Sequence, residues 1–189
     1  MSVRAGMAYL IDRIRTMTNI LAEENSAMDD QTIQDHLDRH RLHVKYAPCM
    51  TEGRIAPGGS VTYVDFVAPY QHWEGTASGR PFGYQLVDGG YNDITASGSV
   101  VSDPVQGWWT FGTAPTRPVM ISGASYDIYA AAADILQNRL AQLAEEFDFQ
   151  TQGLDYKVSQ KQVRLMQVIA DYRAQSRGMV SDMKRMDAC

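Results

Sequence analysis

The chain has 189 residues, of which 44% are hydrophobic and 21% charged, and its formal net charge is −5 at pH 7. This length suits one sizeable core, or one domain with an inserted lobe, and is short for two full domains. No apolar run approaches the ~20 residues that span a bilayer, and charged residues interrupt the apolar pattern near the N-terminus. We therefore expect a soluble cytosolic protein with no membrane partner.

Cysteine usage and charge distribution further limit the kinds of protein that the sequence can encode. The two cysteines, Cys49 and Cys189, provide no disulfide framework and no metal-ligand spacing, so we expect free thiols. Residues 153–189 contain seven Lys and Arg against four Asp, a net charge of +3, whereas the preceding residues are acidic. An acidic body argues against a protein that grips nucleic acid over its whole surface.

Two amphipathic helices are predicted near the N-terminus. Apolar residues spaced three and four apart indicate both helices, and Asp29 or Asp30 can cap the second by accepting from its free N–H groups. The first apolar face consists of Met7, Leu10, Ile14, Met17 and Leu21, and the second of Ile33, Leu37 and Val44.

Three histidines share one side of the predicted second helix. His36, His40 and His43 have the spacing i, i+4, i+7, and imidazole is a ligand for Zn, Cu and Ni. Positions seven apart are about 10 Å apart along a helix axis, so one ion cannot easily bind all three. We expect an exposed or interfacial flank instead, and no metal or cofactor.

The segment from about 48 to 122 is predicted to be a small antiparallel β lobe. Twelve of the fifteen glycines and all seven prolines lie between 48 and 123. Between them are short runs of β-type residues, such as VTYVDFV, PFGYQLV, YNDIT, GWWTFG and PVMIS.

Aromatic side chains crowd this lobe. A small lobe needs bulky residues for its own core, which is the simplest interpretation. Exposed aromatic residues can also stack on sugars or bases, or form hot spots for a protein partner. The aromatic residues are Trp73, Trp108, Trp109, Tyr63, Tyr70, Tyr84 and Tyr91, of which we predict Trp108 and Trp109 to contact a partner protein.

A long helix is predicted to begin at Ser125, as N-cap, with Asp127 in its first turn. Four alanines at 130–133 allow a neighbouring backbone to approach closely, so this helix is expected to have partners on more than one side. We predict that Ala130, Ala131 and Ala133 contact a neighbouring subunit.

The last helix is predicted at about 159–189. Apolar residues at alternating spacings of four and three form a seam of two per seven, which is typical of a helix that meets another helix. We predict a docking surface with a basic end, consisting of Leu165, Ile169, Tyr172, Met179, Met183, Met186, Lys184 and Arg185.

Sequence motifs for catalysis are missing. We find no G-x-S-x-G, no P-loop, no H-E-x-x-H and no cysteine with a convincing histidine environment. Adjacent carboxylates such as Glu145 and Glu146 point in different directions on a helix and do not suit acid/base work. The sequence therefore favours a protein that is not an enzyme.

Four segments resemble the head-to-tail connector, or adaptor, proteins of tailed bacteriophages. They are DDQTIQDHLDRHR, GWWTF, GASYDIYAAAADILQ and FDFQTQGLDYKVSQKQVRLMQVIADYRAQSR. The similarity covers most of the chain in order. It implies a structural virion protein, made in the host cytoplasm, that forms a homo-oligomeric ring, typically a dodecamer, beneath the portal.

The resemblance also implies the partners of such a ring. It docks on the portal protein, extends the channel through which genomic DNA passes without sequence-specific binding, and presents a platform for the next neck, stopper or tail protein. Residues 1–189 would then form a single adaptor domain of the α+β class. We expect a four-helix bundle with a β-rich insertion at about 48–122 and a C-terminal docking helix at about 159–189.

Two other functions remain open. The β-lobe aromatics suit a ligand- or carbohydrate-binding module, which substitution of Trp108 or Trp109 would test. A small nucleic-acid-binding protein is the third alternative, and it would show a steeply salt-dependent affinity for DNA.

Overall fold

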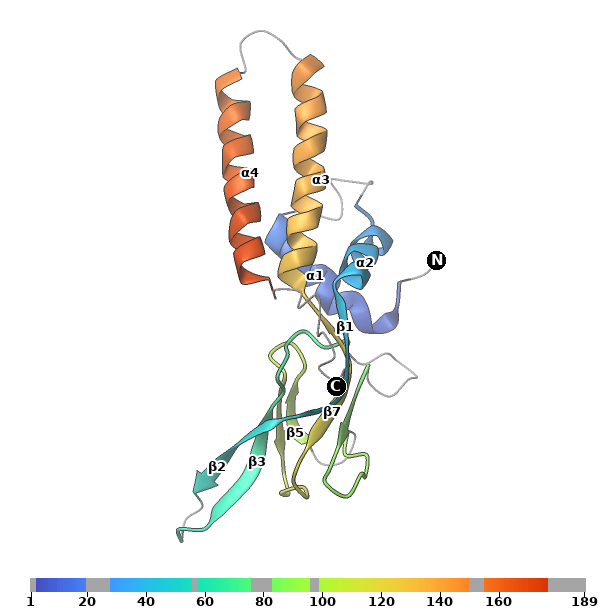
Figure 1. Ribbon diagram of the computed structural model, residues 1–189, viewed down its shortest axis with the longest axis vertical. Coiled ribbons are helices and arrows are strands. Elements are labelled where there is room, and N and C mark those ends of the chain that lie inside the picture. The colour runs from blue at the N-terminus through green and yellow to red at the C-terminus, as the bar shows by residue number, and fades with distance from the viewer. Residues whose placement is uncertain are drawn as a thin grey trace, which may run out of the picture.

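The computed structural model describes residues 3–19, 28–55, 58–75, 83–95, 99–149 and 155–176. These residues form an elongated α+β molecule with helices at one end and β-strands at the other (Figure 1). Among the described helices, none combines the length and the apolar character that crossing a bilayer requires.

The helical end is built from capped amphipathic helices. The predicted Asp29 cap is confirmed, because its side chain accepts a 2.7 Å hydrogen bond from the backbone N–H of Thr32. The carboxylate of Asp127 likewise accepts from the backbone N–H groups of Tyr129 and Ala130. The elements are η1 (Ala5–Met7), α1 (Ala8–Thr18), α2 (Asp30–Arg39), α3 (Ile128–Phe149) and α4 (Asp155–Gln175).

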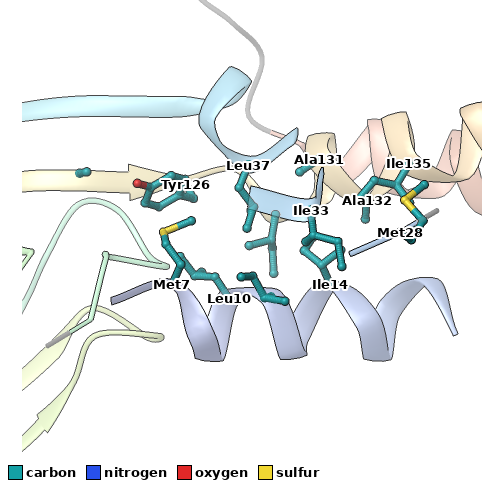
Figure 2. Close-up of a cluster of buried hydrophobic side chains, with 13 residues drawn as sticks. Met7, Leu10, Ile14, Met28, Ile33, Leu37, Tyr126, Ala131, Ala132 and Ile135 are labelled. Carbon is teal, nitrogen blue, oxygen red and sulfur yellow. The ribbon is translucent and has the colours of Figure 1, made fainter. Parts of the chain in front are cut away.

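A buried apolar cluster joins α1, α2 and the first half of α3 (Figure 2). The predicted stripes of the first two helices face this cluster, and burial of each large aliphatic side chain stabilises the fold by about 1.5–3 kcal/mol. Its largest members are Met7, Leu10, Ile11, Ile14, Ile33, Leu37, Tyr126, Ile128 and Ile135.

The predicted four-helix bundle is wrong. A bundle needs helices of similar length, but α1 and α2 have 11 and 10 residues and α3 has 22. The short helices cover only the first part of α3, and α4 packs along α3 as the second arm of a hairpin (Figure 1). Two antiparallel sheets make up the other half of the fold, so the β part is not a small insertion.

The two sheets contain seven strands in the described part of the chain. Sheet A has the order β1-β7-β4 and sheet B has the order β2-β3-β6-β5, with every pairing antiparallel. The strands are β1 (Arg41–Pro48), β2 (Met50–Ile55), β3 (Val61–Val67), β4 (Tyr84–Val87), β5 (Ser99–Asp103), β6 (Trp108–Phe111) and β7 (Met120–Tyr126).

A second apolar core lies between the sheets. Alternate residues along each strand point inwards, as expected for a sheet with one buried face. The contributors from sheet A are Val44, Tyr84, Leu86 and Ile121, and those from sheet B are Phe66, Trp109 and Phe111, with Trp73 beside them.

Two predicted boundaries need correction. The second helix ends before β1, so Val44 lies in a strand and not on a helical face. Ser125 lies in β7, where its hydroxyl donates to the carbonyl of Gln71, and Asp127 replaces it as the helix cap. The physical reason is the pairing of β1 with β7, which places Arg41 opposite Tyr126 and extends the β lobe at both ends.

Arg4 joins the helical end to the β lobe. Its guanidinium donates to both carboxylate oxygens of Asp38 on α2, at 2.8 and 2.6 Å, and to the hydroxyl of Tyr126 on β7 at 2.8 Å. Tyr126 in turn donates to Glu74 at 2.7 Å. Burial, followed by this bond to Glu74, raises the pKa of Tyr126 above its ordinary value, so the phenol stays protonated as a donor.

We predict that Arg4→Met lowers the free energy of unfolding by about 1–3 kcal/mol, because it leaves two half-buried carboxylates without their cation. Urea denaturation measures the change. The matched control is Arg54→Met, which removes a pair with Asp65 in which the Arg54 side chain is 61% exposed. Arg54→Met should lower the free energy of unfolding by less than about 1 kcal/mol. Equal losses for the two variants would contradict the role of Arg4.

Candidate functional site

Sheet B carries an exposed apolar row on its outer face. The pairing register places Met50, Val67 and Trp108 side by side on β2, β3 and β6, and Asp103 completes the row on β5. Met50 is 68% exposed and Trp108 is 42% exposed. We call these three apolar residues the outer row, in which Val67 is half-buried between its two exposed neighbours, and apolar residues grouped at a surface are typical of a protein-binding site.

The next row faces the opposite way. Trp109 lies opposite Phe66 and is 1% exposed, and its indole N–H donates to the Tyr84 hydroxyl at 3.2 Å. The Trp109 and Tyr84 rings meet edge to face. The predicted partner contact at Trp109 is therefore wrong, because adjacent strand residues point to opposite faces and this one fills the core, whereas Trp108 remains available.

An arm formed by the ends of β2 and β3 extends beyond the sheet (Figure 1). Ile55 pairs with Val61 near its tip, and these side chains are 76% and 51% exposed. Arg54 pairs with Asp65 at 2.9 Å nearer the sheet. A two-stranded ribbon with apolar residues at its end is marginally stable by itself in water, so this arm gains from a partner surface.

The predicted docking seam of the last helix instead packs within the chain. Ile169 is 7% exposed and forms a cluster with Leu136 of α3, with Leu165 and Tyr172 packed against it. The Tyr172 hydroxyl also donates to the carbonyl of Met17 at 2.9 Å. This packing leaves Ile169 without surface for a partner, because the seam of α4 meets α3 in the same subunit, whereas Leu165 and Tyr172 are half-buried and their assignment to portal docking stays a prediction.

The opposite side of α4 is the exposed one. Val163 is 63% exposed and Met166 is 55% exposed, and Ala170 and Ala174 are exposed on the following turns. These four residues have spacings of three, four and four, which places them on one face. We call them the α4 outer face. The spacing of these four residues is visible in the sequence, but the seam that contains Leu165 and Ile169 is more regular, and the docking surface was predicted there.

The alanine run is largely internal. Ala131 is 0% exposed in the helical core, and Ala133 is 1% exposed in the cluster between α3 and α4. Neither has surface for a neighbouring copy, so their assignment to a subunit interface is wrong. Ala130 alone of the three is half-buried and reaches the surface.

Several predicted residues lie outside the described ranges. These are Met179, Met183, Lys184, Arg185, Met186 and Cys189. Cys49 is described and is a free thiol, as predicted, and burial raises its pKa to about 12.

The three histidines are separated by the fold. His36 lies on α2, buried against α3, where its ring approaches Asn138, and His40 bonds Asp134 at 2.8 Å. His43 is exposed on β1. Burial, followed by the charge of Arg39, lowers the pKa of His36. In the described residues, no group of three or more His, Cys, Asp or Glu could hold a metal ion.

A groove of about 490 Å³ lies on the exposed face of sheet A. Arg41, His43 and Lys45 line one side of it along β1, and Gln85 and Asp93 line the other. Asp93 accepts from Gln85 at 2.9 Å and from the backbone N–H and hydroxyl of Thr95. Its carboxylate is thus committed to structural bonds, and the groove offers cations without an acid/base pair for catalysis.

The aromatic residues of the β lobe do not form one platform. Trp73, Trp109 and Tyr84 are buried in the core, and Tyr63 and Tyr70 are half-buried. Trp108 and Tyr91 are the exposed members of the predicted set. The larger part of this aromatic surface is therefore used for folding, as the simplest interpretation of the sequence expected.

We predict that Trp109→Ala lowers the free energy of unfolding by about 3–5 kcal/mol, because it leaves a cavity between the sheets. Its matched control, Trp108→Ala, should change it by less than about 1 kcal/mol, since that side chain is on the surface. Thermal and urea unfolding of both variants measure the difference. A stable Trp109→Ala protein would contradict the described core.

We also predict that the protein loses stability as the pH falls below about 6.5, the ordinary pKa of histidine. The pKa of His36 is lowered in the folded state, so the unfolded chain binds its proton first and unfolding becomes more favourable as the pH falls. Urea titrations of wild type and His36→Gln between neutral and mildly acidic pH measure the effect. The variant should lose less stability, and His43→Gln, an exposed control, should behave as wild type.

Comparison of the chain with family models, with curated proteins and with solved structures finds no match.

Proposed function

We propose that this protein is a structural head-to-tail adaptor of a tailed bacteriophage, which assembles as a ring of identical copies between the portal and the next neck or tail component. The observation that carries the proposal is the presence of two exposed apolar surfaces on one elongated subunit, one on the helical half and one on the β half (Figure 1). The resemblance of the sequence to phage connector proteins is the reason for proposing this particular assembly.

The helical surface is the α4 outer face. Val163 and Met166 are separated by one turn and are both more than half exposed, although α4 already buries its other side against α3. A helix with apolar residues on two sides can bind a second neighbour, which covers the side that the first leaves exposed. The α3–α4 hairpin extends away from the β lobe along the long axis of the molecule, and α4 forms one side of this hairpin (Figure 1).

The β surface combines the outer row with the arm. Met50, Trp108, Ile55 and Val61 are exposed there, and Trp is the residue type most enriched at binding hot spots. Single exposed apolar residues are common on any protein, but here they form two pairs on one sheet and its extension, Met50 with Trp108 in the outer row and Ile55 with Val61 on the arm.

Two such surfaces, one on each half of an elongated subunit, suit a subunit that has one partner above and another below. A ring of copies with the same orientation presents twelve or so identical helical ends on one side and as many β ends on the other. By the resemblance, the portal would bind the helical side and the next neck, stopper or tail protein the β side.

The charge of the chain agrees with a channel for DNA. The net charge is −5, and a negative lining repels phosphates and allows the duplex to slide without sequence-specific binding. The proposal assigns no catalytic role and no cofactor, and it places the protein in the host cytoplasm during assembly and in the neck of the virion afterwards.

We predict that the double variant Val163→Glu/Met166→Glu binds the portal protein of the same phage about tenfold or more weakly, because two charges replace the apolar contact. A pull-down with purified portal and native mass spectrometry measure binding. The control is Gln167→Glu, which adds charge at an exposed polar position of the same helix. Unchanged portal binding by the double variant would contradict the assignment of this face.

A further inference from the structure

We propose that sheet B continues from one copy to the next, with β2 of one subunit paired to β5 of its neighbour. This inference rests on the proposed ring and adds the contact that closes it. It concerns the two strands at the ends of the order β2-β3-β6-β5, whose outer edges pair with no strand in the described part of the chain. The partner is a second copy of the chain.

Strand direction favours this partner. Sheet B has four strands with only antiparallel pairings, so β2 and β5 run in opposite directions. A second copy in the same orientation therefore brings its β5 antiparallel to β2, as at every pairing inside the sheet. The contact joins two different edges, which makes it a head-to-tail interface that can close into a ring.

Sheet A lacks this property. Its three strands leave β1 and β4 running in the same direction, so a copy in the same orientation would meet them in parallel. The outer edge of β4 is also occupied, because the backbone N–H of Ile94 donates to the carbonyl of Leu86 at 2.9 Å. Sheet B is thus the sheet suited to continuation.

The register defines which residues meet. Across sheet B, Met50, Thr51 and Glu52 of β2 lie in the same three rows as Asp103, Ser102 and Val101 of β5. The register shifts beyond Glu52 on β2 and before Val101 on β5, so the regular part of each edge is three residues long. A junction of these segments would extend the three rows into the next copy.

The junction would bury apolar side chains that are exposed in the single subunit. Met50 lies on the β2 edge and is 68% exposed, and in the continued sheet it packs beside the outer face of the neighbouring β5. The outer row of one copy is then continuous with the outer row of the next copy. The exposed arm beyond the junction, with Ile55 and Val61, stays uncovered in this arrangement and is available to the next component.

For a given number of copies, the spacing of strands gives the circumference of the ring. Four strands at about 4.8 Å occupy about 19 Å per copy, so twelve copies give a continuous sheet with a circumference of about 230 Å. A ring of that circumference leaves a channel that is wide enough for a DNA duplex after the second sheet is accommodated. The sheet geometry is therefore compatible with the dodecamer that the resemblance implies.

Cross-linking tests the pairing. In a Cys49→Ala/Cys189→Ser background, Met50→Cys and Ser102→Cys, both at exposed edge positions, are made as two separate proteins, mixed at high concentration with the portal, and treated with a short bis-maleimide. We expect a cross-linked dimer in the mixture and none from either variant alone, because the interface joins β2 to β5. Dimers within one variant would indicate a twofold interface and overturn the proposal.

A matched control and a second readout separate the outcomes. Lys45→Cys, on exposed β1, mixed with Ser102→Cys should give no product. In the unmodified protein, assembly should slow hydrogen exchange of the amides at 50–52 and 101–103. Rings without the mixed product and without this protection overturn the sheet junction but leave the adaptor function. A protein that stays monomeric with portal overturns both.

Discussion

The guanidinium of Arg4 is the point at which the two halves of the molecule are fixed to each other. It contacts Asp38 of α2, the hydroxyl of Tyr126 on β7 and, at 3.4 Å, Glu74 of the β lobe. Two carboxylates, one phenol and one cation lie together there, between the two apolar cores. Strand pair β1–β7 crosses the same junction, so helices and sheets are held in one relative orientation.

That fixed orientation is what makes the exposed surfaces useful. A subunit of a ring must present its upper and lower faces at a constant angle, because a small error in each copy prevents closure. Each half of the chain buries its own core and still leaves one apolar surface outside: the α4 outer face on the helical hairpin, and the outer row with its arm on sheet B.

The sequence predicted much of the local structure, but the predicted fold, a four-helix bundle with a small β lobe, is wrong because the arrangement of the parts could not be read from it. Periodicity found the helical faces of Leu10 and Ile33 and the cap at Asp29, since these depend on residues close in the chain. It missed β1, because the run from Arg41 to Lys45 has one buried residue among cations and becomes a strand only through pairing with β7.

The assignment of sites failed for a related reason. Regular apolar spacing in α4 predicts contact with another helix but does not say whether that helix belongs to a partner, and α3 of the same subunit covers Ile169. Trp108 and Trp109 could not be separated before the strand was known, since alternation places one outside and the other in the core. Residues left over after intramolecular packing, such as Val163 and Met166, are the better guide to assembly.

Electron cryomicroscopy of the protein assembled with its portal tests the account most directly, because it shows the relative orientation of neighbouring copies. The account predicts a closed ring in which every α3–α4 hairpin faces the portal, every β lobe faces away from it, and sheet B runs unbroken between subunits. Isolated monomers, or pairs of copies related by a twofold axis with hairpins pointing in opposite directions, would contradict it.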